Sequence, residues 1–156
     1  MERIERLFWS IALPGFGQLL NKQYVKGVLF VLLEVIINIE SHFNKAIQLS
    51  FLGETKEAHM IIDYQWILFY PCLYFFAMWD AFKFAKATPP PPYSFLPFAF
   101  CAYIVTTGVF YAPKVHIDGI FFGPIWFPMI CVLPGLIVGL LFQSLALLKK
   151  ERRKKT

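Results

Sequence analysis

The chain has 156 residues, of which 58% are hydrophobic, 19% aromatic and only 16% charged. An ordinary soluble domain has about 25% charged residues, so a soluble fold of this length could not bury so much apolar surface. The formal charge of +5 does not indicate nucleic-acid binding, because the basic residues lie outside the apolar stretches, as they do in membrane proteins. The composition therefore predicts an all-α integral membrane protein.

The first apolar segment, residues 7–20, contains a Pro-Gly-x-Gly break. A helix needs about 20 apolar residues to cross a bilayer, and this segment is shorter. We therefore expect a re-entrant or interfacial helix here, with a fifth full span as the alternative.

Four later stretches are long enough to span a bilayer. At about 1.5 Å per residue each would cross a hydrocarbon core about 30 Å thick. Residues 1–148 are therefore predicted to form one membrane-embedded helical bundle, followed by a basic tail over residues 149–156. The four predicted transmembrane helices cover residues 25–43, 64–84, 93–112 and 125–148.

Three connections join these predicted helices. The loop over residues 44–63 is expected to hold a short surface helix, and residues 113–124 form a shorter loop on the same side. On the opposite side, Thr88 and Pro89–Pro92 predict a stiff polyproline II spacer. A docking site for a proline-reading domain is the alternative for this spacer.

The basic residues orient the chain. With four spans, twelve Lys and Arg residues lie on one side of the membrane and three on the other. Cytoplasmic loops carry the excess of basic residues, so both termini of this multi-pass protein are predicted to face the cytoplasm. The tail is also expected to bind anionic lipid headgroups.

One carboxylate lies in the middle of the first predicted span. Glu34 is followed by Asn38 and Ser41, at helical spacing along one stripe. Ionisable residues in the membrane are candidate functional sites, so Glu34 is either an ion or proton site or a neutral acid hydrogen-bonded within the bundle. In the second case, Thr106 or Thr107 of the third span is the expected partner.

Asp80 lies in an apolar run at the cytoplasmic end of the second predicted span. An unpaired charge near hydrocarbon is costly, so this carboxylate needs partners. Lys83 is expected to supply part of them. We also expect hydrogen bonds from Gln18, Asn21 or the backbone amides of residues 15–17, which would lock the re-entrant turn to the second span.

Gly135 and Gly139 form a small-xxx-small pattern in the fourth predicted span. This spacing lets two helix backbones approach closely. The pattern leaves open whether the neighbouring helix belongs to the same chain.

The sequence holds no common catalytic motif, so we predict no enzyme activity, no cofactor and no metal. Two pairs of His and Asp residues on the outer side are the possible exceptions to the prediction of no metal. His59 with Asp63 and His116 with Asp118 are the residues that could hold an outer-face metal, although such loop residues are usually only solvated.

The segment around the Pro-Gly break resembles a family pattern. It is similar to small bacterial polytopic membrane proteins related to the two-transmembrane-segment domain group, over about residues 7–86. Lys22 stands where the family usually has a glycine and Leu20 where an aromatic is common, so the loop is expected to be less tight than in typical members. The residues that carry the resemblance are Pro14, Gly15, Gly17, Gln18, Asn21, Lys26 and Gly27, with Trp79, Asp80 and Ala81 further on.

This resemblance implies a bacterial cell-membrane location and little about activity. From the sequence we expect a non-enzymatic accessory, assembly or regulatory subunit that acts with a membrane-protein partner or as a homo-oligomer. The alternatives are a transport or permeation component that uses Glu34 and a membrane-embedded enzyme with an outer-face metal.

Overall fold

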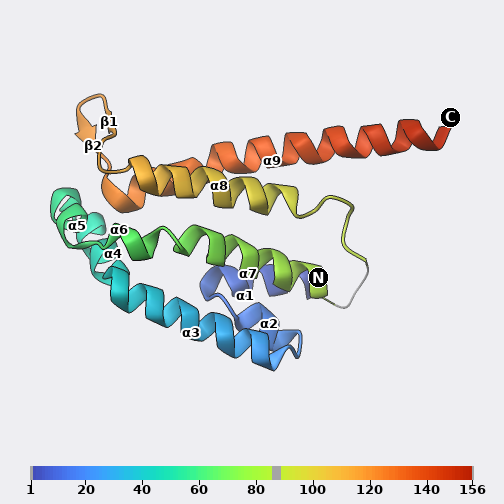
Figure 1. The fold of residues 1–156 in the computed structure, drawn as a ribbon, viewed down its shortest axis with the longest axis horizontal. Helices are drawn as coiled ribbons and strands as arrows, with labels where there is room; N and C mark the ends of the chain where they lie inside the picture. The colour runs from blue at the N-terminus through green and yellow to red at the C-terminus, as the bar shows by residue number, and fades with distance from the viewer. Residues whose placement is uncertain (1, 86–88, 156) are drawn as a thin grey trace.

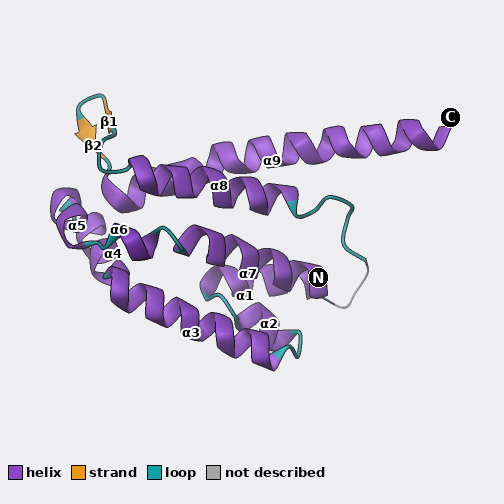
Figure 2. Cartoon of the chain, in the orientation of Figure 1, coloured by secondary structure: helices purple, strands orange, loops and turns teal. Residues whose placement is uncertain are grey.

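The computed structural model describes residues 2–85 and 89–155, which form nine α-helices and one two-stranded ribbon (Figures 1 and 2). Thr88, at the start of the predicted proline spacer, and Thr156, at the end of the predicted tail, lie outside the described residues. The all-α prediction is confirmed at the level of fold class, and the ribbon is a small addition at one end.

The first apolar segment is a helical hairpin rather than the single helix predicted over residues 7–20. Helix α1 covers Glu2–Ala12 and helix α2 covers Phe16–Leu20. The chain breaks between them because Pro14 has no amide hydrogen to donate and Gly15 adopts a left-handed conformation with φ of 106°.

The first predicted span is helix α3, Tyr24–Ser41, which ends at His42 in a left-handed conformation with φ of 56°. The chain continues as α4, Phe43–Phe51, and α5, Thr55–Ile61. The prediction of one short surface helix in the loop was therefore incomplete, since residues 44–63 form two helices.

The second predicted span is interrupted. Helix α6 covers Tyr64–Ile67 and α7 covers Tyr70–Phe84. Pro71 lies in the first turn of α7 and cannot donate to a carbonyl of the preceding turn, so the helix restarts there. Asp63 caps α6 by accepting hydrogen bonds from the amides of the two residues that follow Tyr64.

The third and fourth predicted spans are α8, Leu96–Tyr111, and α9, Gly123–Lys155. Between them, β1, His116–Ile117, pairs antiparallel with β2, Ile120–Phe121. The sequence placed a boundary at residue 148, but α9 is continuous for 33 residues, or about 50 Å. The basic tail is therefore the last turns of one long helix.

The helices form a layered bundle in which α7 lies between α3 on one side and α8 on the other, with α9 packed along α8 (Figure 1). The glycines of α9 permit this last contact. A Cβ atom at Gly135 would lie 2.9 Å from Cys101 Cα, and one at Gly139 would contact Pro97 Cα. The small-xxx-small pattern thus packs against α8 of the same chain.

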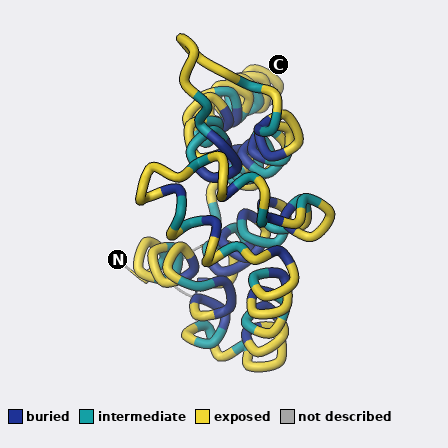
Figure 3. Tube along the Cα trace, turned by 90° about the vertical axis from the view of Figure 1, so that its left-hand side faces the viewer, coloured by how far each residue is buried: buried dark blue, intermediate teal, exposed yellow. Residues whose placement is uncertain are grey.

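The outward sides of the long helices are exposed (Figure 3), and many of their exposed side chains are large and apolar. On α3, Val25 is 85% exposed and Ile39 63%, and on α9 Leu133 is 63% exposed. Among the described residues, two helical stretches are long and apolar enough to cross a membrane, Tyr64–Phe84 and Gly123–Arg153, while Leu96–Tyr111 is a shorter apolar helix.

Candidate functional site

The hairpin of α1 and α2 begins and ends at the same end of α7. The Tyr74 hydroxyl donates a hydrogen bond to the Ile11 carbonyl oxygen at 2.7 Å, near the end of α1. At the start of α1, the Arg3 guanidinium lies 5.0 Å from the centre of the Phe82 ring. Helix α1 therefore runs antiparallel to α7, and α2 leads back to the level of Asp80.

Four polar side chains connect this hairpin and the start of α3 to α7, and we call them the Asp80 joint. The Gln18 amide donates to Asp80 Oδ2 at 3.2 Å and to the Ala77 carbonyl oxygen at 2.7 Å. The Asn21 amide donates to the Ala81 carbonyl oxygen at 2.8 Å. Lys26 Nζ forms an ion pair with Asp80 Oδ1 at 3.0 Å. The members of the joint are Gln18, Asn21, Lys26 and Asp80.

The contact between Gln18 and Asp80 that the sequence predicts is present, but the expected cation is wrong. Lys26, in the first turn of α3, pairs with Asp80, whereas Lys83 lies over the rings of Trp79 and Phe84. A cation in the first turn is disfavoured by the helix dipole, and the Asp80 carboxylate, only 4% exposed, offsets that cost.

Three glycines of the motif lie where backbones cross. A Cβ at Gly15 would lie 2.5 Å from the Gly27 carbonyl oxygen, and one at Gly27 would lie 2.5 Å from Leu19 Cδ2. A Cβ at Gly17 would contact the Ser10 hydroxyl and lie 2.6 Å from Ala81 Cβ. The motif thus packs α2 against α1, α3 and α7 at once.

The turn between α2 and α3 is closed by backbone hydrogen bonds. Lys22 adopts a left-handed conformation with φ of 63°, and its amide donates to the Leu19 carbonyl oxygen at 2.9 Å. The Gln23 amide donates to the Gln18 carbonyl oxygen at 2.9 Å. Lys22 takes the left-handed conformation at a typical cost of about 1–2 kcal/mol, and whether the loop is looser than in the resembled proteins stays a prediction.

Glu34 faces α7, not α8. Glu34 is 7% exposed and lies beside the Tyr70 side chain. The Oε2 atom has no hydrogen-bond partner among the described residues. The expected partners were wrong, because Thr106 and Thr107 donate to carbonyl oxygens of their own helix, at 2.7 and 2.9 Å.

The rest of the predicted polar stripe does not extend the Glu34 site. The Asn38 amide donates to Asn44 Oδ1 at 3.1 Å, across the junction of α3 and α4. Ser41 is buried and donates to the Ile37 carbonyl oxygen of its own helix. Asn38 and Ser41 therefore make local contacts within and at the end of α3 and do not contact Glu34.

The two outer pairs considered for a metal have other contacts. His59 Nδ1 lies 2.8 Å from the Tyr64 hydroxyl, and Asp63 is engaged as the cap of α6. His116 lies against the Phe121 ring, with centroids 5.1 Å apart. Within residues 2–85 and 89–155, no three His, Cys, Asp or Glu side chains are grouped to hold a metal ion.

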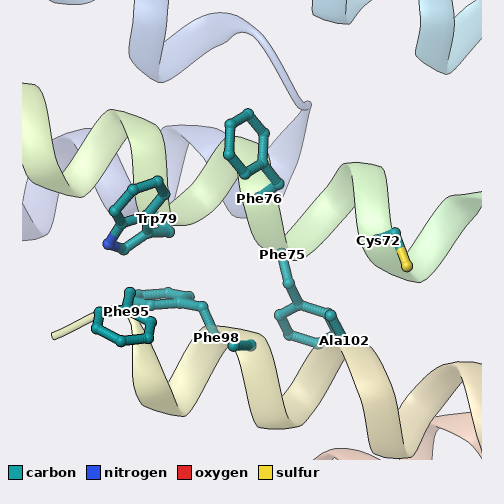
Figure 4. Close-up of a pocket in the computed structure, with 8 residues that line it drawn as sticks. Cys72, Phe75, Phe76, Trp79, Phe95, Phe98 and Ala102 are labelled. Atoms are coloured by element: carbon teal, nitrogen blue, oxygen red, sulfur yellow. The ribbon is translucent and has the colours of Figure 1, made fainter. Parts of the chain in front are cut away.

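Two apolar cavities border α7 within the described part of the chain. One, of about 350 Å³, lies between α7 and α8, where Phe75 and Trp79 face Phe95, Phe98 and neighbouring side chains (Figure 4). The other cavity has a volume of about 450 Å³. Helices α4, α6 and α7 line it on one side, and α8 and α9 line it on the other. Its walls include Tyr70 and Tyr74, whose roles the sequence did not indicate.

Comparison of the chain with protein families, curated proteins and solved structures found no match.

Proposed function

We propose that the chain is a four-span protein of the cell membrane, with both termini in the cytoplasm and the α1–α2 hairpin entering from the cytoplasmic side. In this proposal it acts as a non-enzymatic accessory, assembly or regulatory subunit of a membrane complex. The observation that carries the proposal is the division of its side chains: Asp80 is paired with Gln18 and Lys26 inside the bundle, and large apolar side chains face outward.

The outward faces support insertion in a bilayer. Soluble monomers rarely expose contiguous apolar patches of more than a few hundred Å², yet α3 and α9 each expose a row of large apolar side chains. Helix α3 is about 27 Å long and α8 about 24 Å, close to a hydrocarbon core of about 30 Å. The exposed side chains are Val25, Val28, Leu29, Leu32, Val35, Ile36 and Ile39 on α3, with Leu133, Leu136, Ile137, Leu140 and Leu141 on α9.

The charges of α3 are compatible with a span. Lys26 is at the start of the helix and reaches Asp80, and Glu34 is buried against α7 rather than facing outward. Charged groups within membrane helices normally face the bundle interior in this way. The third charged residue of α3, Glu40, is exposed in the last turn of the helix. The side of α3 that faces away from the bundle is therefore apolar from Val25 to Ile39 and ends in this charge.

The use of the polar groups supports an accessory role. In the Asp80 joint, two amide side chains hold the hairpin to α7, and one ion pair holds the start of α3 to α7. Such groups stabilise one arrangement of helices. The outward faces of α3 and α9 expose rows of large apolar side chains, which suit contact with another membrane helix.

Affinity purification tests this proposal. The tagged chain, extracted from native membranes in lipid nanodiscs, is expected to bring one membrane protein, or a second copy of itself, in stoichiometric amount. The first variant carries two serine substitutions on the α9 face, Ile137→Ser and Leu140→Ser. Its matched control carries two on the α3 face, Val28→Ser and Leu32→Ser. Loss of the partner with one pair and not the other supports the proposal, and a monomer without a stoichiometric partner contradicts it.

A transport or permeation component is the second candidate, favoured by the unpartnered Oε2 atom of Glu34. A transporter would move a solute into liposomes, and Glu34→Gln would remove that movement while leaving the folded protein intact.

A further inference from the structure

The 450 Å³ cavity lies between the helices of the bundle and is open to the surface, and we call it the α7–α9 cavity. Side chains from α1, α4, α6, α7, α8 and α9 line it, and all but the two tyrosines are wholly apolar. We propose that it binds one acyl chain of a bilayer phospholipid. This inference rests on the membrane location proposed above. The residues that the argument uses are Ile11, Phe51, Tyr70, Tyr74, Met129 and Val132.

The opening of the cavity faces an apolar environment. Among the lining residues, Ile11 of α1, Phe51 of α4 and Met129 of α9 are 41%, 65% and 52% exposed. These three side chains mark where the cavity reaches the surface. A mouth surrounded by such groups admits a molecule from the hydrocarbon core more readily than one from water.

The two tyrosines are the polar residues among those that line the cavity. The Tyr74 hydroxyl donates a hydrogen bond to the Ile11 carbonyl oxygen at 2.7 Å, and Tyr70 lies beside Glu34. The rings of Tyr70 and Tyr74 are stacked, with centroids 5.5 Å apart. The site therefore suits a hydrocarbon chain and lacks the convergent polar groups that usually orient a polar ligand.

Size and closure exclude a partner helix as the occupant. Ligand cavities typically measure about 300–1,000 Å³, and this one falls in that range. A helix is about 10 Å wide with its side chains. Helices α7 and α8 pack directly against each other beside the cavity, so a helix cannot pass between them. The residues of this contact are Phe75, Met78, Cys101 and Val105. At the outer end, the rings of Phe51 and Trp126 lie 4.7 Å apart and join α4 to α9.

Water is also a poor occupant. Apolar cavities of this kind stay dry and bind apolar molecules, because a buried water needs about two to four polar partners. In a bilayer, the apolar molecule at the highest concentration beside the mouth is a phospholipid. An acyl chain entering between α1, α4 and α9 would replace the contacts that an empty cavity leaves unmade.

Native mass spectrometry of the purified chain tests this site. After delipidation in detergent, palmitoyl-oleoyl phosphatidylglycerol is added and the lipid retained per chain is measured. We expect one retained lipid for the unmodified chain. Val132→Phe, which fills the cavity from α9, should lower the occupancy about tenfold, and Leu133→Phe, on the exposed face of the same turn, should leave it unchanged.

A milder variant guards against misfolding. Met129→Phe narrows the mouth at an exposed position, so it should reduce retention even if Val132→Phe does not fold. Equal retention in all four proteins, no retained lipid in the unmodified chain, or a co-purified apolar molecule other than phospholipid each overturns the inference. Extraction of membranes with alkaline carbonate separates the two proposals: release of the chain contradicts the membrane location, whereas a chain that stays inserted without lipid contradicts only the acyl-chain site.

Discussion

Substitution of Gly17 by leucine is expected to prevent the native packing of the N-terminal hairpin. A Cβ at this position would contact the Ser10 hydroxyl and lie 2.6 Å from both Ala81 Cβ and the Arg6 carbonyl oxygen. Two of these neighbours are on α1 and one is on α7, and two of the three contacts involve backbone or Cβ atoms that cannot move alone. Overpacking typically costs about 1–3 kcal/mol, so Gly17→Ala should already lower the midpoint of thermal unfolding by several degrees.

Leucine has three more carbon atoms than alanine, so Gly17→Leu should yield little folded protein by size-exclusion chromatography in detergent. Gly53→Asn is the control, because a Cβ at Gly53 has no neighbour within 4 Å and asparagine tolerates its left-handed conformation. That variant should change the free energy of unfolding by less than about 0.5 kcal/mol. A folded, stable Gly17→Leu protein would show that α1, α2 and α7 do not meet as described.

Removal of the cation from the Asp80 joint is the second large effect. Lys26→Met leaves the Asp80 carboxylate, only 4% exposed, without its ion-pair partner at 3.0 Å. Breaking a fully buried pair costs about 3–5 kcal/mol, but Lys26 is 47% exposed and solvent screens part of the interaction. We therefore expect a loss of about 1–3 kcal/mol in the free energy of unfolding.

A double-mutant cycle isolates the pairwise contribution. Lys26→Met combined with Asp80→Asn should show a coupling energy of about 0.5–3 kcal/mol. Lys83→Met is the matched control, since Lys83 is close to Asp80 in sequence but lies over the Trp79 and Phe84 rings. Its cycle with Asp80→Asn should be additive within about 0.5 kcal/mol. Coupling to Lys83 and not to Lys26 would reverse the assignment of the ion pair.

The joint could be predicted in outline because an acid in an apolar run demands a partner, and the break after Pro14 supplied amide side chains at the same end of the bundle. The identity of the cation could not be predicted. Lys83 is three residues from Asp80, whereas Lys26 reaches it only because the first turn of α3 packs beside α7. Tertiary packing, not sequence separation, decides such a pair.

The partner of Glu34 was mispredicted for a related reason. A hydrophobic stretch indicates a helix but not its rotation about its own axis, and the side chain of Glu34 faces Tyr70 rather than Thr106. The division of the second span was visible in the sequence at Pro71, because proline is best tolerated in the first turn of a helix. The separation of α4 from α5 was likewise marked by Gly53, which adopts a left-handed conformation with φ of 85°.

Cysteine labelling tests the central claim, four spans with both termini in the cytoplasm, most directly. In a chain whose three native cysteines are replaced by alanine, single substitutions are placed at exposed positions of the two predicted sides and treated with a membrane-impermeant maleimide. Glu54→Cys and Lys114→Cys should react in intact cells, and Glu5→Cys and Glu151→Cys only in inverted vesicles or after permeabilisation. If Glu54→Cys and Glu151→Cys react from the same side, the four-span arrangement is wrong.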